Sequence, residues 1–338
     1  MVLTNVILPV FFVIFLGFLL RKCAKVDLRT FARAQLYVLS PALAFMSLAK
    51  AEANTGLILW VLLFVLCLEA VLLGLALGIG FLSKRDRAER QAIALASIFM
   101  NSGFYGIPVC MLAFGDWGLV YATIYMVASS IMQSTLGVFL ASAGRRSVRE
   151  AAASVFKVPL IWSIVAARLL VHFDALPPQP LMRMIDMLGA AAIPLGLLLL
   201  GMQLETIAFE SAAWRSALAA GRSRDFGLGE ERSGALPACG AGSSAAHELG
   251  RDISGGLISA AIRILGGLVV SYGIIQLFHF SANMNQVLVV QSSMPTAVNA
   301  IVFSTEFNCR PRLVAVGILA STLASIASVT LILRYVGF

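Results

Sequence analysis

Charged residues are scarce in this sequence. Asp, Glu, Lys and Arg make up 12% of its 338 residues, whereas hydrophobic residues make up 59%. A soluble domain carries about 25% charged residues, so this chain has too little polar surface to cover a water-soluble globule. Its apolar residues also come in runs of about 20, the length that crosses the hydrocarbon core of a bilayer. The composition therefore predicts a polytopic membrane protein.

Residues and motifs that carry catalysis or hold metals are also few. The five cysteines are scattered without a CxxC pair, and there are only three histidines, so we expect neither a disulfide framework nor a metal site. The sequence also lacks GxxxxGK[ST], GxSxG and HExxH, which argues against ATP-driven transport, a hydrolase and a zinc protease. We therefore expect no enzyme activity, no catalytic residues and no cofactor.

Ten apolar runs are long enough to be membrane spans. They lie near residues 2–20, 31–49, 56–82, 91–114, 118–142, 155–172, 183–204, 256–279, 283–306 and 312–336. Only helices and closed barrels cross a bilayer. Because the runs show no period-2 alternation, we expect helices.

The basic residues predict how these spans are oriented. Most of the 25 Lys and Arg residues follow the odd-numbered runs, whereas the even-numbered loops hold only Lys50 and Arg183. The positive-inside rule then places the odd loops in the cytoplasm and both termini on the non-cytoplasmic side of the cell (inner) membrane. The net charge of +8 is explained by these loops, so we expect no nucleic-acid partner.

Prolines interrupt the runs at matching places in two halves of the chain. Pro41 and Pro108 lie in the second and fourth runs, and Pro194 and Pro295 lie in the seventh and ninth. Five spans per half is an odd number, so the two halves must insert in opposite orientations, as in many secondary transporters. We predict an all-α integral membrane protein with ten transmembrane helices as two inverted five-helix repeats, in which helices 4 and 9 are broken and cross.

The halves also define the expected domains. Residues 1–142 form the first repeat, 143–154 a cytoplasmic linker and 155–338 the second repeat. The spacing of the prolines differs between the halves because of a stretch near 207–253, rich in Gly, Ser, Ala and Arg. We expect this stretch to be an irregular cytoplasmic insertion, and we assign it no function.

The two breaks are the candidate substrate site. Proline removes a helical hydrogen bond, and the freed amides and half-helix N-termini then offer partial positive charge to an anion. Pro and Gly can also serve only as kinks in membrane helices, but an apolar kink does not need the Asn, Ser and Thr found at these breaks. The candidate substrate-binding residues are Asn101, Gly103, Gly106, Pro108, Pro295, Thr296 and Asn299.

Two charged residues within spans form a further candidate pair for coupling or for an ion pair. Glu69 lies near the middle of the third span, where an ionisable group is a functional candidate. It could carry a coupling proton, or it could be the structural partner of Arg263 or Arg168. Arg263 could neutralise a substrate carboxylate or pair with Glu69. Sodium at unwound carbonyls is the other candidate coupling ion, so H+, Na+ and no ion all remain open.

The segments NSGFYGIPVCMLAFG, PLGLLLLGMQL and MPTAVNAIVFSTEF, in this order and spacing, resemble the auxin efflux carrier family, which includes plant auxin exporters and bacterial carboxylate permeases. The resemblance implies ten helices in two inverted repeats, with a scaffold part and a transport part. It also implies an organic-anion site at the crossing of the broken helices, and a homodimer formed through the scaffold.

Within that resemblance, Asn101 stands at the position of the family's Asn in the fourth span. The fifth span departs from the pattern of many bacterial relatives, because their paired Asn residues are replaced here by Ser129 and Ser130, followed by Gln133. These three are candidates for a secondary polar set, and the departure bears on which substrate is carried.

The resulting functional prediction is a secondary transporter, or permease, of small organic anions. Malate and malonate are the favoured substrates, with monocarboxylates and indole-type acids as alternatives. The expected partners are this anion and the lipid bilayer. A passive channel or a membrane sensor without coupled transport is the competing hypothesis. A pore should show polar residues along several helices, whereas these spans are mostly apolar outside the breaks.

Overall fold

The computed structural model describes residues 2–50, 55–137, 159–219, 243–278, 280–306 and 309–336. Within these ranges all regular elements are helical, apart from one isolated β-bridge. In chain order they are η1 (Leu3–Ile7), α1 (Leu8–Ala24), α2 (Leu28–Ala34), η2 (Gln35–Leu39), α3 (Ser40–Lys50), α4 (Thr55–Leu82), α5 (Arg87–Ile98), η3 (Ser102–Gly106), α6 (Ile107–Met132), η4 (Gln133–Gly137), α9 (Pro159–His172), α10 (Gln179–Ala219), α11 (Ser243–Ala261), η5 (Ile262–Gly266), α12 (Gly267–Leu277), α13 (Ala282–Ser292), α14 (Asn299–Glu306) and α15 (Pro311–Tyr335). The elements labelled η are π-helical turns.

Seven helices in the described ranges are long and apolar enough to cross a membrane. They are Leu3–Ala24, Leu28–Ala49, Gly56–Leu82, Ser102–Met132, Gln179–Phe209, His247–Leu277 and Pro311–Tyr335. The expectation of an all-helical, multi-pass membrane protein is therefore confirmed. The ten-helix arrangement in two inverted repeats stays a prediction, because α9 and the two broken runs fall short of span length in unbroken helix.

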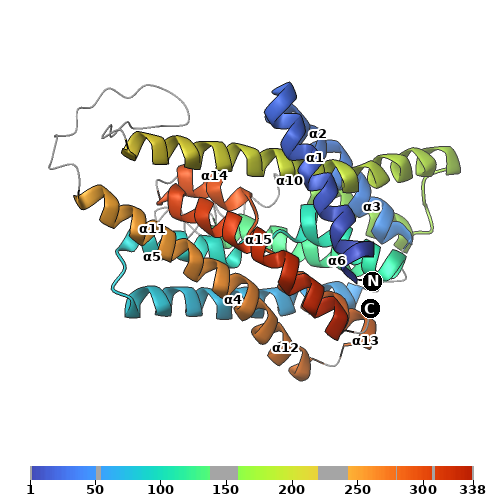
Figure 1. Ribbon diagram of the computed structural model, residues 1–338. Coiled ribbons are helices and arrows are strands. Elements are labelled where there is room, and N and C mark those ends of the chain that lie inside the picture. Colours follow the sequence, from blue (N-terminus) through green and yellow to red (C-terminus); the bar gives the residue numbers. More distant parts are fainter. Residues whose placement is uncertain are drawn as a thin grey trace.

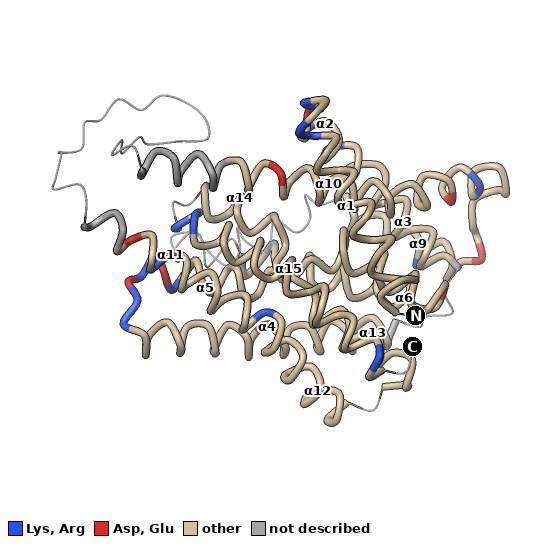
Figure 2. Tube along the Cα trace, viewed as in Figure 1, with Lys and Arg blue, Asp and Glu red and all other residues tan. Residues whose placement is uncertain are grey.

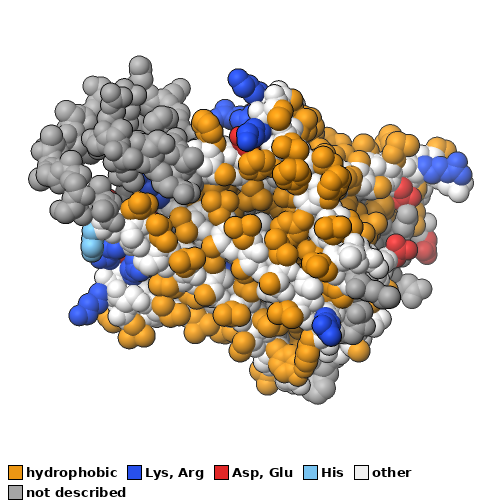
Figure 3. All heavy atoms as spheres, in the orientation of Figure 1, with side chains coloured by type: hydrophobic (Ala, Val, Ile, Leu, Met, Phe, Trp, Pro, Cys, Tyr) orange, Lys and Arg blue, Asp and Glu red, His pale blue; other side chains and the backbone are white. Residues whose placement is uncertain are grey.

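The surface of the bundle has the character of a protein immersed in lipid. Charged residues lie mostly near helix ends and in loops, and the middle of the bundle carries few of them (Figure 2). Hydrophobic side chains cover most of the visible face (Figure 3). Phe12, Trp60 and Leu331 are among the large apolar side chains that are exposed. A contiguous apolar surface of this kind is an aggregation hazard in water, but it is compatible with the hydrocarbon of a bilayer.

The helices pack into two groups. The first helix group consists of α1, α3, α9 and α10, in which α1 and α3 both lie against α10 and α9 lies against α3. The second helix group consists of α4, α5, α6 and α11 to α15. The groups meet where α10 contacts η3 and α15, and where α3 contacts α6. The two ends of the chain lie close together, where η1 contacts α15 (Figure 1).

Glycines allow α1 and α10 to approach closely. A Cβ atom added at Gly17 would lie 2.8 Å from the Cα of Leu198, and one added at Gly201 would lie 2.8 Å from the backbone nitrogen of Phe18. Small residues of this kind commonly let transmembrane helices pack backbone to backbone. The contact joins the first predicted span to the seventh and therefore holds the first helix group together.

We expect Gly201→Val to destabilise the protein by about 1–3 kcal/mol, the usual cost of overpacking a tight site. The added methyl groups would force α1 away from α10. The measurement is thermal unfolding of the purified protein in detergent. Gly74→Val is the matched control, because a Cβ at Gly74 meets nothing within 4 Å. Equal melting temperatures for the two variants would contradict the close-packing assignment.

The chain folds back within α6. Gly115 has φ 69° and ψ −148°, a conformation that is not helical and that favours glycine. A Cβ at Gly118 would lie 2.6 Å from the Cβ of Phe114 and would also meet the carbonyl oxygen of Cys110, eight residues earlier in the chain. The segments before and after Gly115 therefore run back along each other, at the place where the sequence separates the fourth and fifth apolar runs.

Helix covers both ends of the stretch near 207–253, for which the composition suggests an irregular insertion. Helix α10 continues to Ala219, and α11 already begins at Ser243. Residues 207–219 contain Ala, Leu, Glu and Arg, which are strong helix formers, so the helix extends beyond the apolar run. The middle of the stretch, residues 220–242, and the predicted linker 143–154 both lie outside the described residues.

Candidate functional site

The two interrupted runs meet at their breaks. The first lies between α5 and η3, and the second lies between α13 and α14. Met100 and Thr296 form an antiparallel β-bridge. Its two hydrogen bonds run from the backbone N–H of Asn101 to the carbonyl of Pro295 at 2.9 Å, and from the N–H of Ala297 to the carbonyl of Phe99 at 2.8 Å. Backbone N–H and C=O groups of each broken run thus form hydrogen bonds with the other run. Inside a membrane, an unwound backbone needs such partners because water is absent.

Thr296 stabilises this crossing through hydrogen bonds to protein groups, and its side chain does not face a cavity. Its side chain is fully buried, and its hydroxyl donates to the carbonyl of Ala96 at 2.8 Å. Its backbone N–H donates to the hydroxyl oxygen of Ser321 at 3.0 Å. Both polar groups are therefore hydrogen-bonded to other residues of the protein. Of the predicted binding residues, Thr296 is therefore better suited to holding the backbone than to binding a ligand.

Asn101 has an uncommitted amide at the crossing. The residue is 5% exposed and precedes η3, and its carbonyl accepts from the N–H of Gly106 at 3.0 Å. Its side chain makes no hydrogen bond within the described part of the chain. Asn299 is the corresponding residue of the second break: it is exposed and is the first residue of α14. Each half-helix that leaves the crossing thus begins at an asparagine.

The glycines and prolines of the predicted set shape the crossing. Gly106 and Pro108 are buried, and Gly103 is half-buried. A Cβ at Gly106 would lie 2.9 Å from the amide carbon of Gln291, and a Cβ at Gly103 would lie 3.2 Å from the sulfur of Met126. Larger residues at either glycine would displace these side chains.

Two of the three predicted secondary polar residues reach the broken segment. The hydroxyls of Ser129 and Ser102 lie 2.7 Å apart, and the Gln133 amide donates to the carbonyl of Met100 at 3.0 Å. Ser130 instead donates to the carbonyl of Met126 in its own helix at 2.7 Å. The segment that follows Gly115 therefore supports the first break through Ser129 and Gln133.

Gln291 is a candidate that the sequence analysis missed. It is fully buried, and neither its amide nitrogen nor its amide oxygen has a hydrogen-bond partner among the described residues. An unpaired buried amide costs about 1–3 kcal/mol, so it marks a place where a ligand or water would be stabilised. The only available signal was a polar residue four positions before Pro295.

Arg263 reaches the crossing from η5, and it forms no direct salt bridge with Glu69 in the described structure. The fully buried guanidinium of Arg263 donates to the carbonyl of Ser97 at 2.9 Å and to the carbonyl of Ser292. Glu69 is fully buried, and neither carboxyl oxygen has a hydrogen-bond partner among the described residues. The simple alternative of an Arg263–Glu69 contact pair is therefore not the arrangement found.

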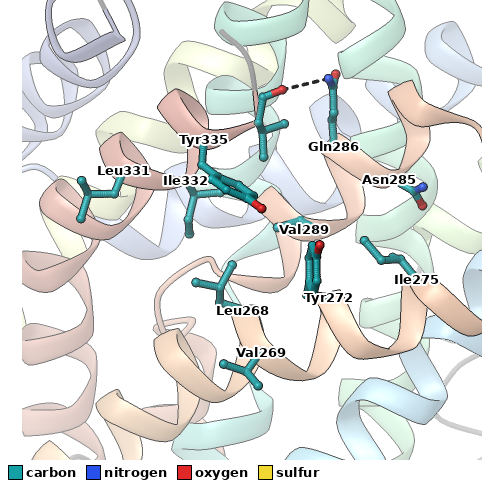
Figure 4. A pocket seen from close by; sticks show the side chains of 11 residues that line it. Leu268, Val269, Tyr272, Ile275, Asn285, Gln286, Val289, Leu331, Ile332 and Tyr335 are labelled. Atoms are coloured by element: carbon teal, nitrogen blue, oxygen red, sulfur yellow. Dashed lines mark hydrogen bonds between the residues drawn. The ribbon is translucent and has the colours of Figure 1, made fainter.

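A separate groove lies away from the crossing. It has a volume of about 530 Å³ and lies between α12, α13 and α15 (Figure 4). Its walls are mainly apolar, and at its edge the Gln286 amide donates to the carbonyl of Val336 at 3.0 Å. It contains none of the predicted site residues. A small dianion would find no cation there among the lining residues, so we do not place the substrate in this groove.

Comparison with known proteins identifies the family of this chain. The family model described as "Membrane transport protein" matches residues 2–333. The chain belongs to this family, the auxin efflux carrier family. Membership covers nearly the whole chain, so the crossing and both helix groups lie inside the matched region.

Three relatives show how far the similarity extends. An uncharacterized transporter of Methanothermobacter thermautotrophicus is 25% identical over 334 residues, covering 97% of this chain and 96% of the relative. An uncharacterized transporter of Methanocaldococcus jannaschii is 22% identical over 304 residues, covering 88% and 85%. A Rhizobium meliloti protein named "Putative malonate transporter" is 28% identical over 216 residues, covering 60% of this chain and 67% of that protein. The chain is thus a membrane transporter of the auxin efflux carrier family.

Proposed function

We propose that this protein is a secondary transporter of small organic anions, and that malonate and malate are its substrates. The observation that carries the proposal is the crossing itself, where two half-helices begin side by side and Asn101 keeps an uncommitted amide. The name of the Rhizobium meliloti relative supports a dicarboxylate. Monocarboxylates are the alternative within the same class of substrate.

The crossing has the electrostatics that an anion needs. The N-terminus of a helix carries about half a positive elementary charge, and its first N–H groups have no partner within the helix. The helix that starts at η3 and continues into α6, and the helix α14, both begin at the crossing. A carboxylate placed between these N-termini would be held by backbone dipoles and by the amides of Asn101 and Asn299, and it would not require a bound metal.

The two helix groups suit an alternating-access mechanism. The crossing belongs to the second helix group, whereas α10 and α3 of the first group lie against η3 and α6. Movement of the second group against the first would expose the crossing to each side of the membrane in turn. We further propose that the first group is the static scaffold and the dimer surface, and that both termini lie on the non-cytoplasmic side of the inner membrane.

Uptake into proteoliposomes tests this function directly. The purified protein would be reconstituted with an imposed pH or sodium gradient, and radiolabelled malonate, malate and lactate would be supplied in turn. We expect saturable uptake of at least one dicarboxylate that unlabelled substrate competes away. Flux that rises linearly with concentration would instead support a passive channel. Binding of a carboxylate without any flux would support a sensor.

A further inference from the structure

The Arg263 guanidinium joins the C-terminal ends of both broken helices. Ser97 lies in the last turn of α5, and Ser292 is the last residue of α13. Their carbonyls belong to the groups that a helix leaves without an internal partner at its end. Arg263 donates to both of them from η5, which lies between α11 and α12. The crossing therefore has two helix N-termini on one side and two helix C-termini that share a single cation.

Two converging C-termini create a strong demand for positive charge. Each carries about half a negative elementary charge. In transporters with discontinuous helices, half-helix C-termini and unwound carbonyls are where a coupling sodium ion is held. In this chain the guanidinium already occupies these carbonyls and is itself fully buried.

The backbone around Arg263 is built for this close approach. A Cβ at Gly267 would lie 2.8 Å from a guanidinium nitrogen of Arg263 and would also meet the carbonyl oxygen of Ser292. Only a glycine therefore lets the first turn of α12 lie against the end of α13 with the guanidinium between them. The two backbone carbonyl oxygens that accept from the guanidinium lower the cost of burying the cation.

We propose that Arg263 is a tethered cation that takes the place of a coupling sodium ion at the crossing, so that transport proceeds without sodium. Arg263 is a positioning residue in this scheme: it fixes the ends of α5 and α13, and thereby the N-termini that receive the substrate. This inference rests on the proposed transport function. It also separates the coupling alternatives, because it leaves a proton or no ion as the partner of the anion.

Replacement of sodium by choline tests whether transport proceeds without sodium. Wild-type uptake in the two salts should agree within about twofold, since no sodium site remains to be filled. Arg263→Lys should keep part of the activity, because it retains a positive charge without the two-pronged donor geometry. Arg263→Ala should reduce uptake by about tenfold or more, because two buried carbonyls lose a charged donor.

Chemical rescue tests whether the guanidinium group of Arg263 is what holds the ends of α5 and α13. Millimolar guanidinium chloride should restore a measurable part of the uptake of Arg263→Ala and should raise its melting temperature in detergent. Arg334→Ala is the matched control, because Arg334 is exposed in the last turn of α15. We expect guanidinium to change neither the uptake nor the melting temperature of that variant or of the wild type.

The outcomes separate the two proposals. Sodium-dependent uptake by the wild type would overturn the tethered-cation inference and leave the transport function intact. Failure of guanidinium to stabilise a folded Arg263→Ala protein would also overturn it. If Arg263→Ala does not fold, the sodium comparison on the wild type and on Arg263→Lys decides. Absence of any carboxylate uptake would refute the transport function, and the stability measurements on Arg263→Ala would still judge the cation's role.

Discussion

Substitution of Asn101 by alanine is expected to reduce carboxylate uptake by about tenfold to a hundredfold. The reason is that a hydrogen bond to a charged group contributes about 1.5–3 kcal/mol, and about 1.4 kcal/mol corresponds to a factor of ten. The Asn101 side chain has no partner within the described part of the chain. Its truncation therefore removes the proposed ligand contact without breaking a hydrogen bond of the folded protein.

The stability of Asn101→Ala should differ little from that of the wild type. The crossing is held by the backbone of Asn101, whose N–H donates to Pro295 and whose carbonyl accepts from Gly106. Both interactions persist in Asn101→Ala. Uptake kinetics and thermal unfolding should therefore diverge, with a large loss of transport and a melting temperature close to that of the wild type.

Asn283→Ala is the matched control for this experiment. Asn283 is exposed near the start of α13, away from the break, so its loss should leave uptake unchanged. An Asn101→Ala protein that takes up malonate at the wild-type rate would remove Asn101 from the substrate site. A parallel fall of uptake and melting temperature would instead assign Asn101 to the fold.

The position of the crossing could be predicted from the sequence because proline and glycine act locally. A proline interrupts a helix whatever its tertiary surroundings. Pro108 and Pro295 occupy matching places in the two halves, which predicted that the two breaks meet. The backbone hydrogen bonds between Asn101, Pro295, Phe99 and Ala297 show this pairing directly. Long-range contact was thus predictable where a local breaker and a repeated pattern coincided.

Partner choice at the crossing could not be predicted in the same way. The hydroxyl of Thr296 is committed to Ala96, which is 200 residues away in the sequence. Arg263 reaches carbonyls of Ser97 and Ser292, whereas a sequence pattern shows only opposite charges and therefore suggested Glu69. Backbone acceptors are identical at every residue, so their pairing depends on tertiary packing.

Substitution of Arg251 by methionine is expected to destabilise the protein by about 3 kcal/mol, at the low end of the cost of breaking a buried ion pair. Arg251 lies in α11 and donates to both carboxyl oxygens of Glu89, at 2.7 and 2.5 Å. The Glu89 side chain is fully buried, so its charge would be left without its main partner. The cost lies at the low end because the Arg251 side chain is 33% exposed and Arg85 lies 3.8 Å from the same carboxylate.

This ion pair gives the protein a specific acid sensitivity. The hydrogen bond from Arg251 holds the pKa of Glu89 below its ordinary value. A carboxyl group with a lowered pKa in the folded state stabilises the protein above the pKa of the unfolded chain, about 4.3 for Glu. That contribution is lost as the pH falls through the lower pKa of the folded state. The wild type should therefore lose stability below about pH 4, and Arg251→Met should lose less of its own over the same range.

A double variant separates the pair from a general effect of the substitution. Glu89→Gln in the Arg251→Met background removes the buried charge but keeps an oxygen that can accept from the N–H of Asp86, as Glu89 does now at 3.1 Å. It should recover much of the lost melting temperature, because replacing both partners of a buried pair is far less costly than removing one.

The result also bears on the second half of the chain. Arg85 donates to the carbonyl of Arg251 at 2.9 Å and to the hydroxyl of Ser254 at 2.8 Å, so the same cluster docks α11 directly after the stretch 220–242. If Arg251→Met were as stable as the wild type at pH 7, the docking of α11 would have to depend on its apolar packing against α5 and α15 and on the hydrogen bonds of Arg85, which do not use the Arg251 side chain.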